Sequence, residues 1–506
     1  MSTSENNKRI IKNTAFLYLR MLIVMFVSLY TSRVVLQVLG VTDFGIYNVV
    51  GGFVSMLVFF TSSLANVTQR YINISLGTND LVKTELVFRQ SLSLMLLLSI
   101  LIFIVGETLG LWFVKSQLVI PTNRFTAALW VYQFSLLSVV CSLLQVPFMG
   151  IIVAHEKMNM YAYLGLFEAF IKLFVVYMLL LSPSIDSLVL YGGLMFLISV
   201  LILVFYVCIC LKNFTECKLN FYWNNEIVRE MSRFVVYNLF GCISWSAGVQ
   251  GTNVLLNIFF GPAVNAARGL SVQVTSVVTR FTENITTAVK PQIIKSYAIN
   301  DLTYMLTLIE KSSKYSYFLA AVISIPTIFE LDLLLNLWLG NVPEYTLIFT
   351  RLVLIDSLIN VFIPSLWIAA NATGDIRRSQ VYGRVFTLLI LPISYLLLKI
   401  CSSPVIPFVI TIFCSLAYWC YCVYDIQIQL NLNVKKYIHN VVFPSTLFTV
   451  YLIIIGCVTC LFFPQDSFVR FIVLALLILL FVPPCIYILS SPNEKEYLLS
   501  FLKKKL

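Results

Sequence analysis

The stretch Asn257-Ile258-Phe259-Phe260-Gly261-Pro262 closes one apolar segment and opens another, which runs on to Asn300-Asp301. The second segment contains Arg268, Arg280 and Glu283. A charged side chain at bilayer depth costs roughly 2.5–3.5 kcal/mol, so it normally faces a bundle interior or a water-filled cavity. Polar residues recur there every three, four or seven positions, which places them on one helix face: Asn265, Arg268, Thr275, Thr279, Glu283, Thr286 and Lys290. We therefore expect a membrane helix with a polar face toward a cavity.

The segment that precedes Gly261 shows the same kind of polar face without charge. Ser246, Gln250, Asn253 and Asn257 are spaced at four, seven and eleven residues, so a helix would align them. We predict that Gln250, Asn253 and Asn257 line the same cavity.

Weak internal symmetry divides the chain. Gly40 and Gly261 each close an apolar segment and lie 221 residues apart, as do Asn79 and Asn300 at the ends of the following segments. Such repeats are common in transporters, with the substrate site between them. We predict a bundle of six helices in residues 1–211, a cytoplasmic linker in 212–230, a second six-helix bundle in 231–430, and two further membrane helices with a basic tail in 431–506.

Composition assigns the chain to the membrane. Of its 506 residues, 59% are hydrophobic and only 11% are charged, and the mean hydropathy is +0.91. Soluble domains carry about 25% charged residues. The sequence predicts an all-α polytopic protein with about fourteen transmembrane helices. The expected segments are 11–39, 44–68, 84–111, 123–154, 160–181, 187–211, 231–260, 262–289, 304–329, 345–371, 380–400, 404–430, 439–463 and 467–489.

The positive charges of the loops predict the orientation. Lys and Arg gather in alternate loops, and the intervening loops are short and neutral or acidic, which puts both termini in the cytoplasm and requires an even number of spans. This pattern also accounts for the net charge of +11 without nucleic acid as a partner. Three residues break the pattern: Lys115, Arg124 and Arg470.

Further charges lie within the apolar segments. Glu168 and Lys172 are one helical turn apart and could pair. Surplus positive charge inside a bundle favours an anionic passenger, because guanidinium groups bind phosphate with two hydrogen bonds. We predict a cavity for substrate lined by Arg20, Arg33, Arg268, Arg280, Lys172, Gln250, Asn253 and Asn257. Ion coupling or charge pairing is expected of Glu283, Glu168, Asp356 and Arg351.

Motifs of catalysis are missing from the sequence. It has no Walker motif, no GxSxG, no HExxH and no His/Cys cluster with metal-ligand spacing. The cysteines lie mostly inside apolar segments, where they are expected to be small core residues. We expect no enzyme activity, no metal and no cofactor.

Several short motifs resemble polysaccharide flippases of the Wzx type, notably the group of lipopolysaccharide biosynthesis proteins in Bacteroides-like bacteria. They are Leu39-Gly-Val-Thr-Asp43-Phe-Gly45, Ala154-His-Glu-Lys-Met158-Asn and Phe260-Gly-Pro-Ala-Val-Asn265-Ala-Ala-Arg268. The resemblance covers roughly residues 9 to 430. It implies the multidrug/oligosaccharidyl-lipid/polysaccharide exporter superfamily, with two six-helix bundles in a V and two extra helices here.

The same resemblance implies a cargo and a place. The cargo would be an oligosaccharide linked to a lipid of the undecaprenyl-diphosphate type, moved to the periplasmic leaflet of the bacterial inner membrane, with the bilayer and other polysaccharide-assembly proteins as partners. Two alternatives stay open. A drug/cation antiporter of the same fold should carry an excess of acidic residues in its cavity, and here arginines predominate. A membrane glycan polymerase usually needs sizeable outside loops, which this chain lacks.

Overall fold

The structure, a computed structural model, describes residues 3–55, 72, 81–155, 157–181, 186–373, 378–463, 468–490 and 495. Within these residues every regular element is a helix and there are no strands. The chain forms two compact units, one of residues 1–270 and 387–407 and the other of residues 271–386 and 408–506. The predicted domain boundary at 212–230 and the superposition of two repeats stay predictions.

The first unit contains the helices of residues 1–270 and one later helix, α14. Helix α5 packs on both α7 and α3, and α1 packs on α6, α5 and α8. Its elements are α1 (Thr3–Ser55), α3 (Leu81–Val105), α4 (Leu111–Ser116), η3 (Thr122–Arg124), α5 (Phe125–Ala154), α6 (Met158–Leu181), α7 (Ser187–Asn213), α8 (Asn225–Phe260), the first turns of α9 (Pro262–Ala298) and α14 (Val385–Ile400). A π-helical turn, η2 (Gly106–Gly110), joins α3 to α4.

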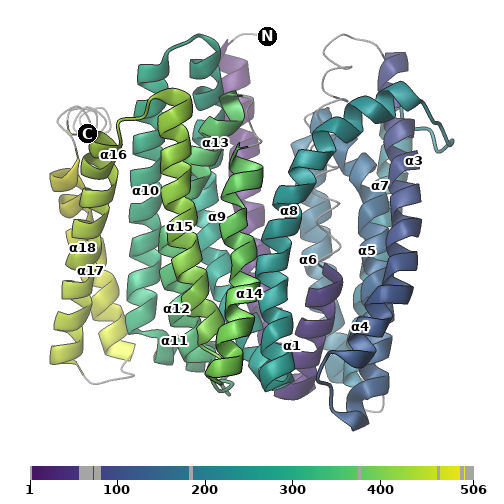
Figure 1. The fold of residues 1–506 in the computed structure, drawn as a ribbon, viewed down its shortest axis with the longest axis horizontal. Coiled ribbons are helices and arrows are strands. Elements are labelled where there is room, and N and C mark those ends of the chain that lie inside the picture. Colours follow the sequence, from purple (N-terminus) through teal and green to yellow (C-terminus); the bar gives the residue numbers. More distant parts are fainter. Residues whose placement is uncertain are drawn as a thin grey trace. The chain divides into compact units, whose positions relative to one another are not determined.

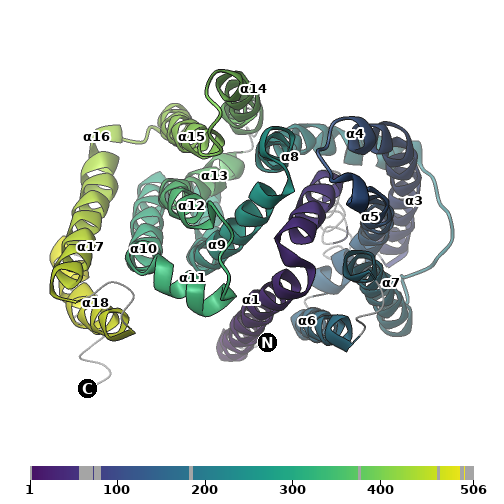
Figure 2. The same ribbon diagram turned by 90° about the horizontal axis from the view of Figure 1, so that it is seen from below.

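The second unit is organised around α10 (Leu302–Phe329). Helix α10 packs against α17, α12 and α13, and α17 lies beside α18 (Figures 1 and 2). The other elements are the remainder of α9, α11 (Leu331–Leu339), α12 (Thr346–Asn360), α13 (Ile363–Thr373), η4 (Arg378–Gly383), most of α15 (Ile406–Leu430), α16 (Val434–Tyr437), η5 (Ile438–Val442), α17 (Phe443–Phe462) and α18 (Phe468–Leu489).

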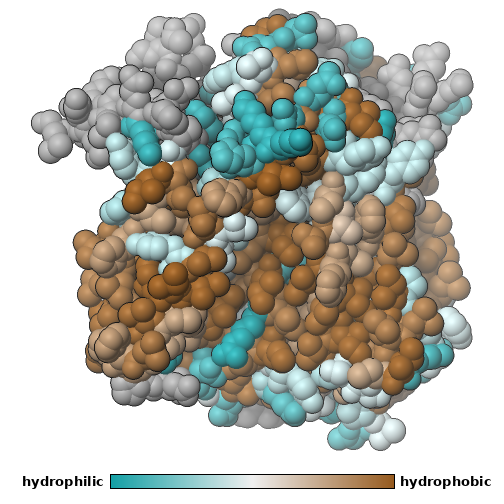
Figure 3. Space-filling model, turned by 60° about the vertical axis from the view of Figure 1, so that its left-hand side comes forward, coloured by the Kyte–Doolittle hydropathy of each residue, from teal (hydrophilic) through white to brown (hydrophobic). Residues whose placement is uncertain are grey.

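The lengths and apolar character of these helices confirm the all-α, multi-pass membrane class. Ten helices of the described chain are long and apolar enough to cross a membrane, or eleven if α10 and α11, which meet at 82°, form one broken span. Helices α8 and α9, with 36 and 37 residues, are outside that set and carry the polar faces predicted above. Figure 3 shows a broad belt of apolar side chains, with polar side chains gathered beyond it.

Two glycines make the turns that the internal symmetry singled out. Helix α1 kinks at Gly40, where φ is 74°, and α8 ends before Gly261, where φ is 82°. Residues with a Cβ rarely adopt positive φ, so glycine allows a sharp break at both places. The first predicted span and the start of the second therefore lie within α1 on either side of Gly40. The rest of the second span, residues 56–68, lies outside the described residues.

Candidate functional site

Four asparagines and an arginine form a polar cluster where α1, α8 and the start of α9 meet. We call Asn48, Asn253, Asn257, Asn265 and Arg268 the asparagine cluster; all of them belong to the first unit. Asn253 on α8 donates from Nδ2 to the Asn48 carbonyl of α1 at 2.9 Å. Asn265 on α9 donates from Nδ2 to the Asn253 backbone oxygen at 2.6 Å and to its Oδ1 at 2.7 Å. The cluster therefore links three helices through amide groups.

Gly52 on α1 permits the close approach of the α8 side chains to α1. A Cβ added at Gly52 would lie 2.7 Å from Asn253 Nδ2 and 2.8 Å from Gln250 Oε1. Both distances are shorter than real Cβ contacts, so a larger residue at 52 would displace the α8 amides. Gln250, one of the predicted cavity residues, is half-buried against this part of α1.

Asn257 binds the backbone of a loop, and its place in a cavity stays a prediction. Its side chain is fully buried. Its Oδ1 accepts from the Val119 amide at 2.8 Å, and its Nδ2 donates to the Val119 carbonyl at 3.3 Å. One side chain of α8 thus satisfies both backbone groups of a residue in the loop before η3, as buried backbone groups require.

Arg268 lies in the same buried region. Its residue is 8% exposed, and Nη2 donates to the Val249 carbonyl of α8 at 2.5 Å. Nearby, Asn265 is fully buried, and its Oδ1 has no hydrogen-bond partner among the described residues. The junction of α8 and α9 therefore buries a guanidinium together with an amide oxygen that lacks a hydrogen-bond partner among the described residues.

The remaining predicted residues of the first unit are distributed over two helices. Arg33 on α1 is half-buried. The side chain of Arg20 lies outside the described part of the structure. Lys172 and Glu168 on α6 form an ion pair at 2.6 Å, and each side chain is 40% exposed. Their shared turn of helix accounts for that pair.

The second unit holds the other predicted charges. On α9, Arg280 is half-buried and Glu283 is exposed. Arg351 Nη2 lies 3.3 Å from Asp332 Oδ2, joining α12 to α11. Asp356 Oδ2 accepts from Asn360 Nδ2 at 2.9 Å within α12. Since Arg268 and Arg280 belong to different compact units, a common cavity for the arginines stays a prediction.

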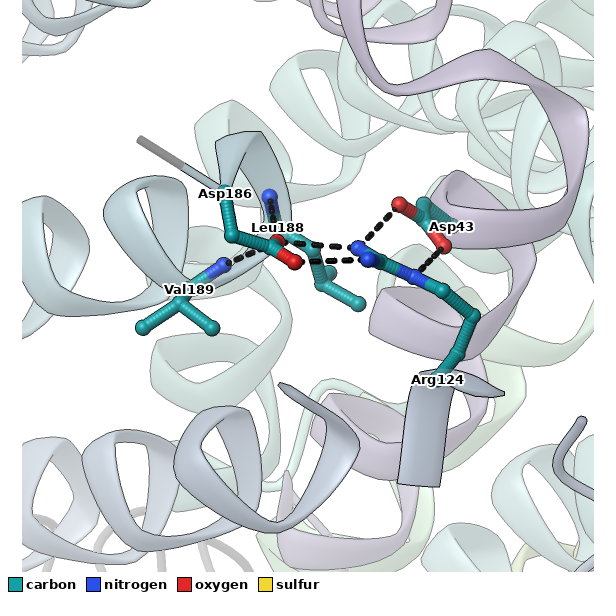
Figure 4. Close-up of polar contacts among 5 residues, drawn as sticks. All are labelled: Asp43, Arg124, Asp186, Leu188 and Val189. Atoms are coloured by element: carbon teal, nitrogen blue, oxygen red, sulfur yellow. Dashed lines mark hydrogen bonds and ion pairs between the residues drawn. The ribbon is translucent and has the colours of Figure 1, made fainter. Parts of the chain in front are cut away.

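Sequence reasoning missed a charged cluster that joins three elements of the first unit. Arg124 in η3 binds Asp43 of α1 through Nε at 2.8 Å and Nη2 at 2.5 Å (Figure 4). It also binds Asp186 through Nη1 at 2.6 Å and Nη2 at 2.9 Å. We call Arg124, Asp43 and Asp186 the Arg124 clamp. The signal was visible, because Arg124 breaks the charge pattern of the loops and both aspartates lie in loops of the same predicted side.

Asp186 also caps the N-terminus of α7. Its Oδ1 accepts from the backbone amides of Leu188 at 3.0 Å and Val189 at 3.3 Å, so it caps the start of α7 (Figure 4). The hydrogen bond from Arg124 holds the pKa of the Asp186 carboxyl below its ordinary value. A carboxylate at a helix N-terminus is also favoured by the helix dipole.

Another residue that breaks the charge pattern, Arg470, is paired in the second unit. Arg470 on α18 binds Glu330, which lies between α10 and α11, through Nε at 2.7 Å and Nη2 at 2.9 Å. Both residues are buried, at 4% and 1% exposure. Among the described residues, no group of three or more His, Cys, Asp and Glu side chains could hold a metal ion.

Comparison with known proteins identifies the fold. No protein-family model matches the sequence, and no curated protein matches it. The chain is similar to an inward-facing multidrug resistance MATE transporter of the MOP superfamily, with TM-score 0.68, 13% identity, and coverage of 81% of this chain and 97% of the other.

Two further structures extend the likeness. The lipid II flippase MurJ in an inward closed conformation has TM-score 0.67 and 11% identity, and the match covers 96% of this chain and 100% of that one. A MOP superfamily transporter from Pyrococcus furiosus, described as having a binding pocket of reverse polarity that suggests a different function, has TM-score 0.57, 14% identity, and coverage of 83% and 96%. At these identities the likeness shows the fold alone: this chain has the fold of MOP-superfamily transporters.

Proposed function

We propose that this chain flips an oligosaccharide linked to a lipid diphosphate from the cytoplasmic to the periplasmic leaflet of a bacterial inner membrane. The carrier would be of the undecaprenyl-diphosphate type, and the product would feed a cell-surface polysaccharide such as an O-antigen or a capsule. Turnover would proceed by alternating access through a cationic cavity, with both termini in the cytoplasm.

The observation that carries the proposal is the extent of the structural match. MurJ, named as a lipid II flippase, matches 96% of this chain and 100% of its own length. The MATE transporters cover 81% to 83% of this chain, so about a fifth has no counterpart in them. The extent of this chain thus corresponds better to the lipid flippase than to the drug transporters.

The chemistry of the membrane arginines supports an anionic cargo. Arg268 places a buried guanidinium, 8% exposed, where α9 meets α8, and its Nη2 donates to the Val249 carbonyl. A guanidinium presents two parallel donors that match the oxygens of a diphosphate, whereas a lysine offers a point charge. Arg268, with Arg20, Arg33 and Arg280, is the residue set that we assign to the diphosphate or to acidic sugars.

Deletion of the gene in its host tests the function directly. We expect a lipid-linked glycan to accumulate on the cytoplasmic leaflet and the matching surface polysaccharide to disappear. Purified protein in proteoliposomes should then move that glycan lipid across the bilayer. Normal surface polysaccharide in the deletion strain, with drug sensitivity instead, would favour the antiporter alternative that the shared MATE fold keeps open.

Substitution of Arg268 tests the residue assignment. Arg268→Ala should abolish glycan export while the amount of protein in the membrane stays near normal, and Arg268→Lys should rescue poorly because it lacks the planar fork. Lys399→Ala, at an exposed lysine of α14, is the control and should export normally. If the Arg268→Ala protein exports glycan normally, or if it fails to accumulate in the membrane, Arg268 has only a structural role in the packing of α9 on α8.

A further inference from the structure

The connection between α7 and α8 is an extended segment that follows α3. Residues 218–224, which we call the strap, contain no helix and run alongside the first turns of α3 (Figures 1 and 2). Side chains of an extended chain point alternately to opposite sides. The two sides of the strap therefore have separate surroundings.

Polar groups attach the first half of the strap to α3. Lys218 Nζ lies 2.8 Å from Glu85 Oε2. One turn further along α3, Arg89 Nε donates to the Asn220 carbonyl at 3.4 Å. Arg89 also pairs with Glu85 at 3.3 Å, so the two α3 residues brace each other as well as the strap.

The second half of the strap is attached in the same way. The Tyr222 amide donates to Ser93 Oγ at 3.0 Å, and the Tyr222 ring lies under the Arg89 guanidinium at 5.4 Å. The Asn224 amide donates to Gln90 Oε1 at 2.7 Å. Gln90 and Ser93 are buried, so these bonds are shielded from water.

The opposite side of the strap is apolar and uncovered. Leu219, Phe221 and Trp223 alternate with the α3-facing residues and are 53%, 60% and 43% exposed. The Phe221 and Trp223 rings stack, with centroids 6.5 Å apart and planes at 4°. Trp223 Nε1 donates to Asn225 Oδ1 at 2.8 Å, so its polar atom is satisfied beside an exposed apolar ring.

The contacts with α3 show where the strap lies along the axis of that membrane helix. Lys218, Asn220 and Tyr222 contact residues 85, 89 and 93 in turn, so the strap follows α3 for about 12 Å along its axis. The long run of exposed apolar side chains on α3 begins at Leu96, less than one turn beyond Ser93. The whole candidate span is Leu81–Ser116, so the strap lies against the N-terminal end of that span, next to the start of its long exposed apolar run.

We infer that the strap is an interfacial anchor that inserts Leu219, Phe221 and Trp223 into the boundary between phospholipid headgroups and acyl chains. Aromatic rings with a satisfied polar atom are favoured at this depth. The exposed Lys212 at the end of α7 adds attraction for anionic headgroups. Since α8 starts at Asn225, the anchor holds the first turn of that helix at the membrane surface.

Fluorescence of the full chain tests the depth of Trp223. Wild type and Trp223→Phe are reconstituted in vesicles of phosphatidylcholine and phosphatidylglycerol that carry bromine at acyl positions 6,7 or 11,12. The difference between the two proteins isolates the emission of Trp223. We expect bromine at 6,7 to quench it at least twofold more than bromine at 11,12, and aqueous iodide to quench it weakly. Trp112→Phe, at a 60% exposed tryptophan of α4, provides the matched control for the subtraction.

Two results would overturn the anchor. Strong quenching of Trp223 by iodide, with none by brominated lipid, would place the strap in water. Protection from both quenchers would show that protein, such as a second copy of the chain, covers it. In parallel, the Phe221→Ser/Trp223→Ser double variant should speed hydrogen exchange of residues 218–224 several-fold in vesicles and leave α10 unchanged. Unchanged exchange in the strap would also reject the proposal.

Discussion

Arg124 and Arg470 bind each of their carboxylate partners through two nitrogens, but their surroundings differ. In the Arg124 clamp, one guanidinium serves two aspartates, and the side chains of Arg124, Asp43 and Asp186 are 24%, 16% and 36% exposed. Arg470 binds the carboxylate of Glu330 and the Phe329 carbonyl, and the Arg470 and Glu330 side chains are 5% and 0% exposed. The first group is partly hydrated and carries one net negative charge, whereas the second is neutral and sealed from solvent.

The difference shows that similar geometry can have unequal energetic weight. A partly exposed ion pair exchanges protein contacts for water at little net cost, typically below about 1 kcal/mol. Breaking a buried pair leaves an uncompensated charge, which costs about 3–5 kcal/mol. The comparison also explains two residues that break the charge pattern of the loops, because Arg124 and Arg470 are each neutralised by a carboxylate from a predicted outside loop.

The largest effect should come from Glu330→Ala. It removes the carboxylate that Arg470 binds and should lower the free energy of unfolding by about 3–5 kcal/mol. Thermal unfolding in detergent and the amount of folded protein in the membrane measure this. Asp332→Asn is the matched control, because Asp332 pairs with Arg351 at 3.3 Å with half-exposed side chains and should cost below about 1 kcal/mol.

A double substitution sharpens that result. Glu330→Leu together with Arg470→Met removes both charges and should recover most of the lost stability, since apolar replacement of a buried pair is often neutral. If the double variant were as unstable as Glu330→Ala, the contribution of this site would be the shape of the α10–α11 junction rather than charge compensation.

Arg124→Ala should have an intermediate effect. It leaves Asp43 and Asp186 without their shared cation, and we expect a loss of about 1–2 kcal/mol, the sum of two partly exposed ion pairs. Asp43→Asn in the same chain should restore part of it by relieving the repulsion. Hydrogen exchange in the first turn of α7 and the unfolding temperature report the change. If Arg124→Ala and Glu330→Ala lowered the free energy of unfolding equally, burial would not explain the difference between the two sites.

The smallest effect should come from Asp186→Asn. Asparagine keeps an oxygen for the α7 cap, and Arg124 keeps Asp43, so we expect a loss below about 1 kcal/mol at pH 7. The pKa of Asp186 is lowered in the folded protein, so its ionised form stabilises the fold above the ordinary carboxyl pKa, and that contribution is lost as pH falls through the lowered pKa. The gap between the unfolding temperatures of wild type and variant should therefore persist from pH 7 to about pH 4 and close only below about pH 4. A gap that stays constant below about pH 4 would contradict the assigned charge effect.

Much of the architecture was predictable because membrane helices follow local rules. Length and apolar content predicted the spans, for example 187–211 against the observed α7 at Ser187–Asn213. The spacing of Gly40 and Gly261 predicted a turn at each, and both have positive φ, which glycine adopts readily because it lacks a Cβ. The division into compact units was not visible, because α14 joins the first unit through packing that no local pattern encodes.

The polar contacts were less predictable. The helical spacing of Gln250, Asn253 and Asn257 predicted one polar face, but it could not show that Asn257 binds the backbone of Val119, 138 residues away. The Arg124 clamp was hidden for the same reason: charges in three loops can be counted from the sequence, whereas their meeting depends on how α1, α5 and α7 pack. Pairs within one turn, such as Glu168 and Lys172, needed no such knowledge.

The separation between Glu330 and Arg470 also has a consequence for synthesis in the membrane. The two residues are 140 positions apart, so Glu330 leaves the ribosome on the order of 10 s before its partner exists. During that interval the guanidinium that binds this carboxylate is absent. We therefore expect the junction of α10 and α11 to become fully stable only after α18 has been inserted.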